Sequence, residues 1–172
     1  MDSASPTESE GLAPAKPPAV KKIKLIVSDL HLGKGRLLDG GGLNSLEEFY
    51  YGEKLVEFIH YYSTGIYRDY EVELIINGDF LNFLQCDYKG HFLSVITEGV
   101  SLEIMRDIIR GHDHVFKAMA DFAAKPGNSI TYVVGNHDQA MLWPACRAFL
   151  NQVIGTPVRY KNIVYFFDGV HI

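Results

Sequence analysis

Three apolar runs of this sequence each end in side chains that can bind a metal or transfer a proton. These side chains follow the runs in a fixed order: Asp29 and His31, then Asp79, then Asn136, His137 and Asp138. A mixture of carboxylate, imidazole and amide oxygen suits a borderline divalent metal such as Mn, Fe or Zn. It contains too much nitrogen for a calcium site, and the sequence has no EF-hand loop. The favoured chemistry is metal binding, provided that the three stretches meet.

The elements that must position these side chains alternate between strand and helix. Apolar runs predict strands over residues 23–27, 72–79 and 130–134. Helical spacing of apolar residues predicts helical segments over about 45–62 and 97–124. This order predicts an α/β fold with parallel strands, in which ligands bind beyond the carboxyl ends of the strands. We therefore expect the three polar ends to share one edge of a sheet.

Local patterns predict further details of these elements. The continuous apolar run 23–27 predicts a strand that is covered on both faces. Ser45 and Glu48 predict a capping box at the start of the first helix. Gly111 is a possible break in the second helical segment, and apolar runs after residue 161 predict further strands.

Carboxylates packed at one sheet edge would repel each other and lose hydration unless a cation neutralised them. The two oxygens of a carboxylate such as Asp79 can bridge two ions. Two metals about 3.5–4 Å apart form the clamp that is used for in-line displacement at phosphorus. Such a pair lowers the pKa of a shared water and neutralises charge in the transition state. A dinuclear site at this edge could therefore carry out displacement at phosphorus.

The ordered set Asp29-Leu30-His31, Gly78-Asp79 and Gly135-Asn136-His137-Asp138 resembles the calcineurin-like metallophosphoesterase family over residues 23–172. The resemblance implies a metallophosphoesterase-type four-layer αββα sandwich, with two sheets between helices. It implies an enzyme that hydrolyses a phosphate ester or pyrophosphate bond with a metal-activated hydroxide at a dinuclear site. The implied cofactors are two divalent metal ions, Mn, Fe or Zn.

The resemblance also implies which residues bind these metals. Asp29 and His31 would hold the first metal, and Asp79 would bridge both. Asn136 would bind the second metal through its amide oxygen.

The implied catalytic roles belong to the third stretch, where His137 would protonate the leaving oxygen or stabilise the phosphoryl group and Asp138 would orient His137. The family often has the motif GDxxD, but here the last position is Asn82, so a supporting negative charge is missing. Asn82 could still support the metal ligands, and this is the less favoured interpretation. The family also adds a His and a GHxH pair farther along, whereas His171 is the only late histidine. We therefore expect a chain that lacks the last ligands and part of the second sheet.

The chain divides into a tail and one domain. Residues 1–20 hold four of the seven prolines and no aromatic residue, which predicts a disordered N-terminal segment. Residues 21–172 would form the metallophosphoesterase domain.

Within the family, the short layout is closest to the bacterial lipid-A-pathway enzymes that cleave UDP-2,3-diacylglucosamine, while the GDxxDRG and GNHE patterns of protein Ser/Thr phosphatases are absent. We expect a small-molecule or lipid-linked phosphoester substrate, whose identity stays open because loops carry specificity. The alternative is a catalytically silent metallophosphoesterase-fold scaffold for protein binding. The presence of His137 favours catalysis over the scaffold.

Composition narrows the partners and the compartment. The formal net charge of −5 provides no basic footprint for bulk nucleic acid, and disfavours a nuclease. No apolar run reaches the roughly 18–20 residues of a transmembrane segment, and the N-terminus has no apolar core of a secretory signal. Cys86 and Cys146 have no CxxC spacing and are expected to be reduced thiols in a cytoplasmic protein. The oligomeric state stays open.

Three further stretches have a functional and a structural interpretation. The glycine-rich loop with Lys34 and Arg36 could cradle a phosphate, but a flexible surface loop is favoured. The HDH stretch at residues 112–114 resembles a metal signature, but neighbouring helical residues diverge, so a solvated helix face is favoured. Residues 88–91 could contact a substrate, and this is the less favoured interpretation.

Overall fold

The computed structural model describes residues 20–37, 40–162, 166–167 and 170–171. The expected tail lies outside the described residues, except for Val20. The strands are β1 (Lys22–Val27), β2 (Glu71–Asn77), β3 (Ser129–Val134), β4 (Arg159–Asn162), β5 (Phe166–Phe167) and β6 (Val170–His171). The helices are α1 (Gly52–Tyr61), α2 (Glu98–Gly111), α3 (Asp113–Ala124) and α4 (Pro144–Ile154), with 3₁₀ turns η1 (Gly65–Tyr67), η2 (Phe83–Gln85) and η3 (Gln139–Leu142). None of these described helices is long and apolar enough to cross a membrane.

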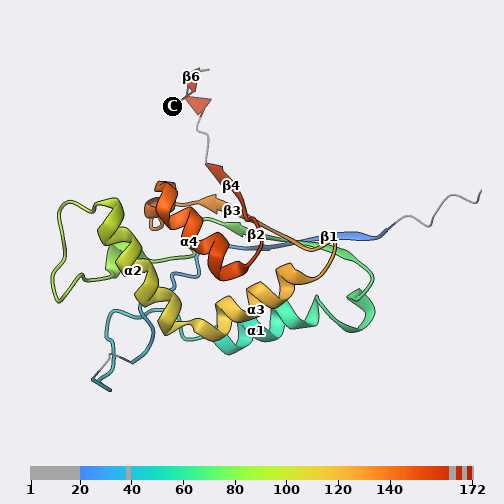
Figure 1. Ribbon diagram of the computed structural model, residues 1–172, viewed down its shortest axis with the longest axis horizontal. Coiled ribbons are helices and arrows are strands. Elements are labelled where there is room, and N and C mark those ends of the chain that lie inside the picture. Colours follow the sequence, from blue (N-terminus) through green and yellow to red (C-terminus); the bar gives the residue numbers. More distant parts are fainter. Residues whose placement is uncertain (1–19, 38–39, 163–165, 168–169, 172) are drawn as a thin grey trace, which may run out of the picture.

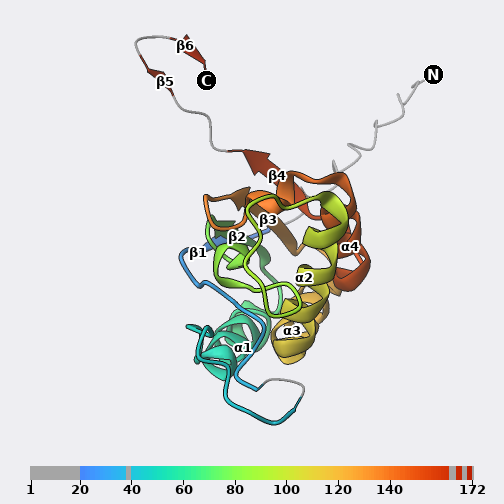
Figure 2. The same cartoon turned by 90° about the vertical axis from the view of Figure 1, so that its left-hand side faces the viewer.

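β1, β2, β3 and β4 form one parallel sheet in the order in which they occur along the chain. This arrangement confirms the predicted α/β class and the parallel strands. Because each strand is added on the same side of the previous one, right-handed crossovers place every connecting helix on the same face. Figures 1 and 2 show the helices gathered on one side of this sheet. Of the strands predicted after residue 161, the described residues form the short antiparallel pair β5 and β6, while residues 163–165 lie outside the described residues. β4 begins before the predicted stretch and ends at Asn162.

The opposite face of the sheet is exposed along β1, whereas on β2 and β3 it is half-buried at Ile75 and Val133 and buried at Thr131, which is 8% exposed. Lys24 is exposed on it, and Ile26 is 65% exposed. The prediction that this strand is covered on both faces is therefore wrong, because its residues alternate between the helix-covered face and solvent. Ion pairs between Lys22 and Glu71 (2.6 Å) and between Lys24 and Glu73 (2.9 Å) join β1 to β2.

Helix α1 begins at Gly52, later than the predicted start near residue 45. The predicted capping box does not form, and the residue at the N-cap is Tyr51, whose side chain makes no capping hydrogen bond. Glu47 is instead buried, and Glu48 accepts a hydrogen bond from Gln85 at 3.1 Å. These tertiary contacts outweigh the weak local preference for helix in this segment.

The second helical segment is divided at Gly111, as predicted, into α2 and α3. Thr97 caps α2 by accepting a hydrogen bond from the backbone of Val100. A Cβ atom on Gly111 would meet the backbone of Lys34 and Gly35. The junction between α2 and α3 therefore lies directly against the loop that follows β1.

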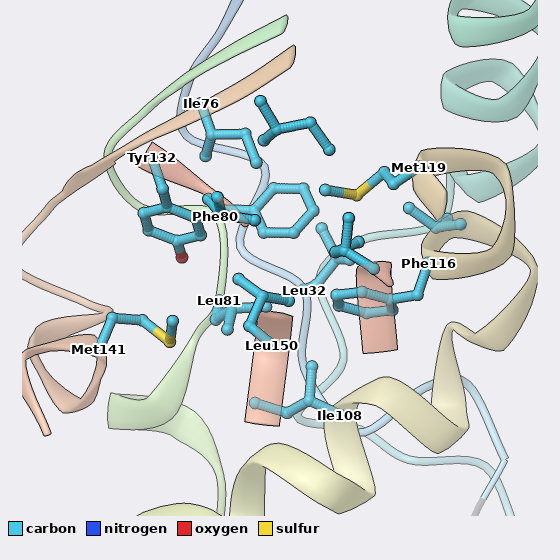
Figure 3. Close-up of a cluster of buried hydrophobic side chains, with 14 of the residues drawn as sticks. Leu32, Ile76, Phe80, Leu81, Ile108, Phe116, Met119, Tyr132, Met141 and Leu150 are labelled. Carbon is cyan, nitrogen blue, oxygen red and sulfur yellow. The ribbon is translucent and has the colours of Figure 1, made fainter. Parts of the chain in front are cut away.

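One hydrophobic core fills the space between the sheet and the helices (Figure 3). Phe80 packs edge-on against Tyr132 of β3 and Phe116 of α3, with ring centroids 6.1 and 6.0 Å apart. Leu32 and Phe80 are almost fully buried in this core, and each directly follows a predicted site residue, His31 or Asp79. The core therefore anchors the two loops that carry the site.

Candidate metal centre

The carboxyl ends of β1, β2 and β3 meet at one edge, as the sequence predicted. The N–H of Asp29 donates to the carbonyl of Gly78 at 3.3 Å, and the N–H of His31 donates to the carbonyl of Asp79 at 2.9 Å. The N–H of Gly78 donates in turn to the carbonyl of Val133 at 3.0 Å. The hydrogen bonds of the sheet thus continue into the loops, which holds the three site stretches beside one another.

The backbone at this edge adopts an uncommon conformation. Asp29, His31 and Asp79 have φ angles of 54°, 53° and 50°, in the left-handed region that non-glycine residues seldom adopt. Backbone strain of this kind persists where the surroundings enforce it, and it clusters at functional sites. Its concentration at the ends of two neighbouring strands marks this edge as the candidate site.

His31, Asp79 and His137 form the centre of the site. Each offers one ligand atom, and these atoms all lie within 4.8 Å of one another. The imidazole rings of His31 and His137 meet edge to face, with centroids 4.4 Å apart. His31 Nδ1 is buried and has no hydrogen-bond partner. A buried, unpartnered nitrogen beside a carboxylate and a second imidazole fits a divalent metal, because such donors are otherwise left unsatisfied.

The other two predicted metal ligands lie at the rim of this centre. Asp29 and Asn136 are both exposed, and the carboxylate of Asp29 is not part of the three-residue group. His137, which we expected to transfer protons, takes a place among the possible ligands instead. The structure therefore brings one possible mononuclear donor group together, and a second metal stays a prediction from the resemblance.

Asp79 also positions the third stretch of the site. Its Oδ1 atom accepts a hydrogen bond from the N–H of His137 at 2.9 Å. A Cβ atom on Gly135 would collide with Oδ1 and with the backbone nitrogen of Asp79. Glycine at position 135 therefore lets the turn after β3 approach the carboxylate closely.

Asp138 is buried beneath the site. We expected it to orient the ring of His137, but its hydrogen-bond partners are other groups. Its Oδ2 atom accepts hydrogen bonds from the Tyr132 hydroxyl at 2.6 Å and from the N–H of Phe80 at 3.1 Å, and Oδ1 accepts from the N–H of Gly135 at 2.5 Å. Burial raises the pKa of Asp138, although these three hydrogen bonds oppose the rise. The carboxylate of Asp138 links the loops after β2 and β3, and both of its oxygens are used in these hydrogen bonds.

Asn82, and not Asp138, forms the hydrogen bond to the ring of His137. Gln85 Nε2 donates to the carboxylate of Glu48 at 3.1 Å, and Asn82 Nδ2 donates to Gln85 Oε1 at 2.7 Å. This leaves Asn82 Oδ1 facing His137 Nδ1 at 3.0 Å. An amide oxygen only accepts, so Nδ1 carries the hydrogen and Nε2 of the neutral ring keeps its lone pair. His137 can therefore bind a metal, or take up a proton, through Nε2.

No family model and no curated protein matches this chain.

We expect the Asn82→Ala variant to lose roughly 10- to 100-fold in metal affinity or in turnover, as is usual when a group that orients a metal-binding histidine is removed. Mn²⁺ affinity by calorimetry, with kcat and KM measured separately, checks this. The Asn82→Asp variant keeps an acceptor for Nδ1 and is expected to recover most of the loss. If Asn82→Ala and Asn82→Asp lost the same amount, then the hydrogen bond to His137 would not be the cause.

The start of the glycine-rich loop after β1, at residues 33–35, is anchored and differs from the expected flexible loop, whereas Leu37 and residues 40–43 are exposed at the surface as expected and residues 38–39 lie outside the described residues. The buried carboxylate of Glu47 accepts hydrogen bonds from the N–H groups of Gly33 (3.2 Å) and Gly35 (2.5 Å). Lys34 forms ion pairs with Asp87 (3.2 Å) and Asp107 (3.6 Å). The amides of Gly33 and Gly35 and the charge of Lys34 are thus already occupied within the protein and do not cradle a phosphate.

The HDH stretch divides into two environments. His112 is only 4% exposed, and its Nε2 atom lies 3.2 Å from Glu47 Oε2, so the prediction of a solvated helix face is wrong for this residue. Asp113 and His114 remain at the surface. No signal local to the sequence identified the buried pair of Glu47 and His112, because its members are 65 positions apart.

Proposed function

We propose that this protein is a metal-dependent phosphoesterase that hydrolyses a phosphate ester or pyrophosphate bond. The observation that carries the proposal is the group of His31, Asp79 and His137, with the buried Nδ1 atom of His31 left without a partner. Two imidazoles and a carboxylate suit Mn, Fe or Zn. The left-handed backbone at Asp79 and His31 supports the view that this edge is built for function.

In this proposal His31 and Asp79 hold the ion, with His137 as the third ligand or as the proton donor. When bound, such an ion polarises a phosphoryl oxygen and lowers the pKa of a water molecule. Asp79 holds the backbone of His137 in place, and Asn82 holds its ring, so that Nε2 is available at a defined position. We include Asp29 and Asn136, at the same edge, as ligands of a second ion.

The proposal also covers the layers of the fold and the cellular compartment. We propose that a second sheet packs on the exposed face that carries Lys24 and Ile26, which would complete a four-layer αββα arrangement. We also propose a cytoplasmic location, because Cys86 and Cys146 are free, buried thiols.

Metal content and hydrolysis test the function together. The chain is loaded with Mn²⁺, its metal content is measured by mass spectrometry, and hydrolysis of p-nitrophenyl phosphate and its bis ester is followed. We expect at least one ion per chain, and loss of turnover in the His137→Ala variant by roughly 100-fold or more, the range for loss of a proton-transfer group. His60→Ala, at an exposed position on α1, is the matched control and should leave turnover unchanged.

Absence of bound metal under these conditions would overturn the proposal. Metal binding without turnover, and with no effect of His137→Ala on binding, would instead support the silent scaffold.

A further inference from the structure

A cavity of about 490 Å³ opens beside the candidate metal centre, and His137 forms part of its wall. The remaining wall comes from η2, from η3 with the residue that follows it, and from the segment that leads into and begins α2. This volume lies within the range of about 300–1,000 Å³ that is typical of small-molecule sites. A ligand in the cavity would therefore have one end against the proposed metal site.

The wall of this cavity is mainly apolar although it is open to solvent. Leu84, Leu142 and Trp143 line it and are 55%, 51% and 41% exposed. Among the described residues that line it, none carries a lysine, arginine or carboxylate side chain. Large apolar side chains left exposed around a polar centre are typical of ligand-binding surfaces.

The cavity wall also contains a polar group without a partner. Ser101, in the first turns of α2, is fully buried, and its hydroxyl makes no hydrogen bond. Buried hydroxyls are normally satisfied, and because this one is closed to solvent, a ligand could reach it only after the wall of the cavity shifts. A few polar groups within an apolar lining fix the orientation of a ligand, and the accessible ones here are His137 and Gln139.

A second cavity, of about 460 Å³, differs in kind. Its lining includes Lys34, Asp87, Asp107 and Arg110, and it contains none of the three central site residues. Lys34 is already paired with both carboxylates. This contrast favours the apolar cavity as the place for the part of a substrate that is not phosphate.

We infer that the cavity beside His137 binds an apolar alkyl or aryl group that is esterified to the phosphate of the substrate. This inference rests on the proposed phosphoesterase function and narrows its substrate class to amphipathic phosphoesters. Leu84, Leu142 and Trp143 are the residues that determine this specificity. The phosphate would lie at the donor group, and the apolar group would extend from it past His137.

Trp143 makes binding measurable without any turnover, because it is the only tryptophan in the chain. The protein is titrated with butyl-, hexyl- and octylphosphonate, in which the P–C bond resists hydrolysis, and with inorganic phosphate. We expect the fluorescence of Trp143 to shift to the blue with the alkyl compounds only. Affinity should rise by roughly three- to fourfold for each added methylene until the cavity is filled.

Two matched variants test the location of the site. Leu84→Gln is expected to remove most of the dependence on chain length. Ile66→Gln, at a 76% exposed position in η1, makes the same change away from the cavity and should have no effect. Equal affinities along the series, or equal effects of the two variants, would overturn the inference.

The two proposals fail in distinguishable ways. If the protein hydrolyses p-nitrophenyl phosphate but binds the three alkylphosphonates with equal affinity, the phosphoesterase proposal is retained and the apolar site is overturned. If the affinity rises with alkyl chain length and Leu84→Gln removes this rise, but the chain binds no Mn²⁺, an apolar ligand site is retained and the phosphoesterase proposal is overturned.

Discussion

Replacement of Asp79 by asparagine is expected to lower the affinity for Mn²⁺ by roughly 100-fold or more, since even groups that only support a metal ligand contribute 10- to 100-fold. The substitution removes the charge that offsets the cation but keeps an Oδ1 acceptor for the N–H of His137. We therefore expect the fold to persist while metal binding and hydrolysis are lost. Calorimetric titration with Mn²⁺, together with the thermal unfolding temperature, checks both parts.

The matched control is Asp69→Asn, which removes a carboxylate from an exposed position next to η1. This variant should bind Mn²⁺ like the parent protein. His31→Ala should behave like Asp79→Asn, because His31 belongs to the same group of possible metal ligands and its buried Nδ1 atom has no hydrogen-bond partner. Unchanged Mn²⁺ affinity in both site variants would contradict the metal centre.

Replacement of Glu47 by alanine is expected to lower the free energy of unfolding by about 3–5 kcal/mol, because it removes a buried carboxylate that accepts hydrogen bonds from several buried donors. The side chain of Glu47 is fully buried, and it accepts hydrogen bonds from the backbone of Gly33, Gly35 and Phe49 beside His112. Its loss would leave these donors unsatisfied. Urea unfolding measures the change. Glu57→Ala, at an exposed position on α1, should have little effect.

The same carboxylate predicts how stability depends on pH. Burial raises the pKa of Glu47, but hydrogen bonds from His112 and from the backbone of Phe49 and Gly33 outweigh it, and the pKa falls below its usual value of 4.5. The stabilisation is therefore present above about pH 4.5 and is lost as the pH falls through the lower pKa of the folded state. Acid unfolding of Glu47→Gln should be less steep over this range than that of the parent protein. Identical pH profiles would show that Glu47 does not contribute.

The path of the chain near the site follows from its sequence in large part. Apolar runs identified β1, β2 and β3, and helical spacing identified α2 and α3 with their break at Gly111, because both patterns are local. The start of α1 at Gly52 could not be predicted from the sequence. The segment around Glu47 has helical composition, but the buried hydrogen bonds of Glu47 reach Gly33 and His112, which no local pattern indicates.

The sequence by itself determined which chemical groups stand at the strand ends and that these ends share one edge, since parallel strands linked by helices leave no other arrangement. Only the tertiary structure decided which of those groups face one another. His31, Asp79 and His137 meet, while Asp29 and Asn136 stay exposed, because left-handed turns and hydrogen bonds between the loops set each side chain's direction. The same holds for Asn82, whose contact with His137 spans 55 positions, and for the apolar cavity, whose wall is assembled from separate segments. Distances between such groups depend on packing across the whole core, which the order of residues along the chain does not specify.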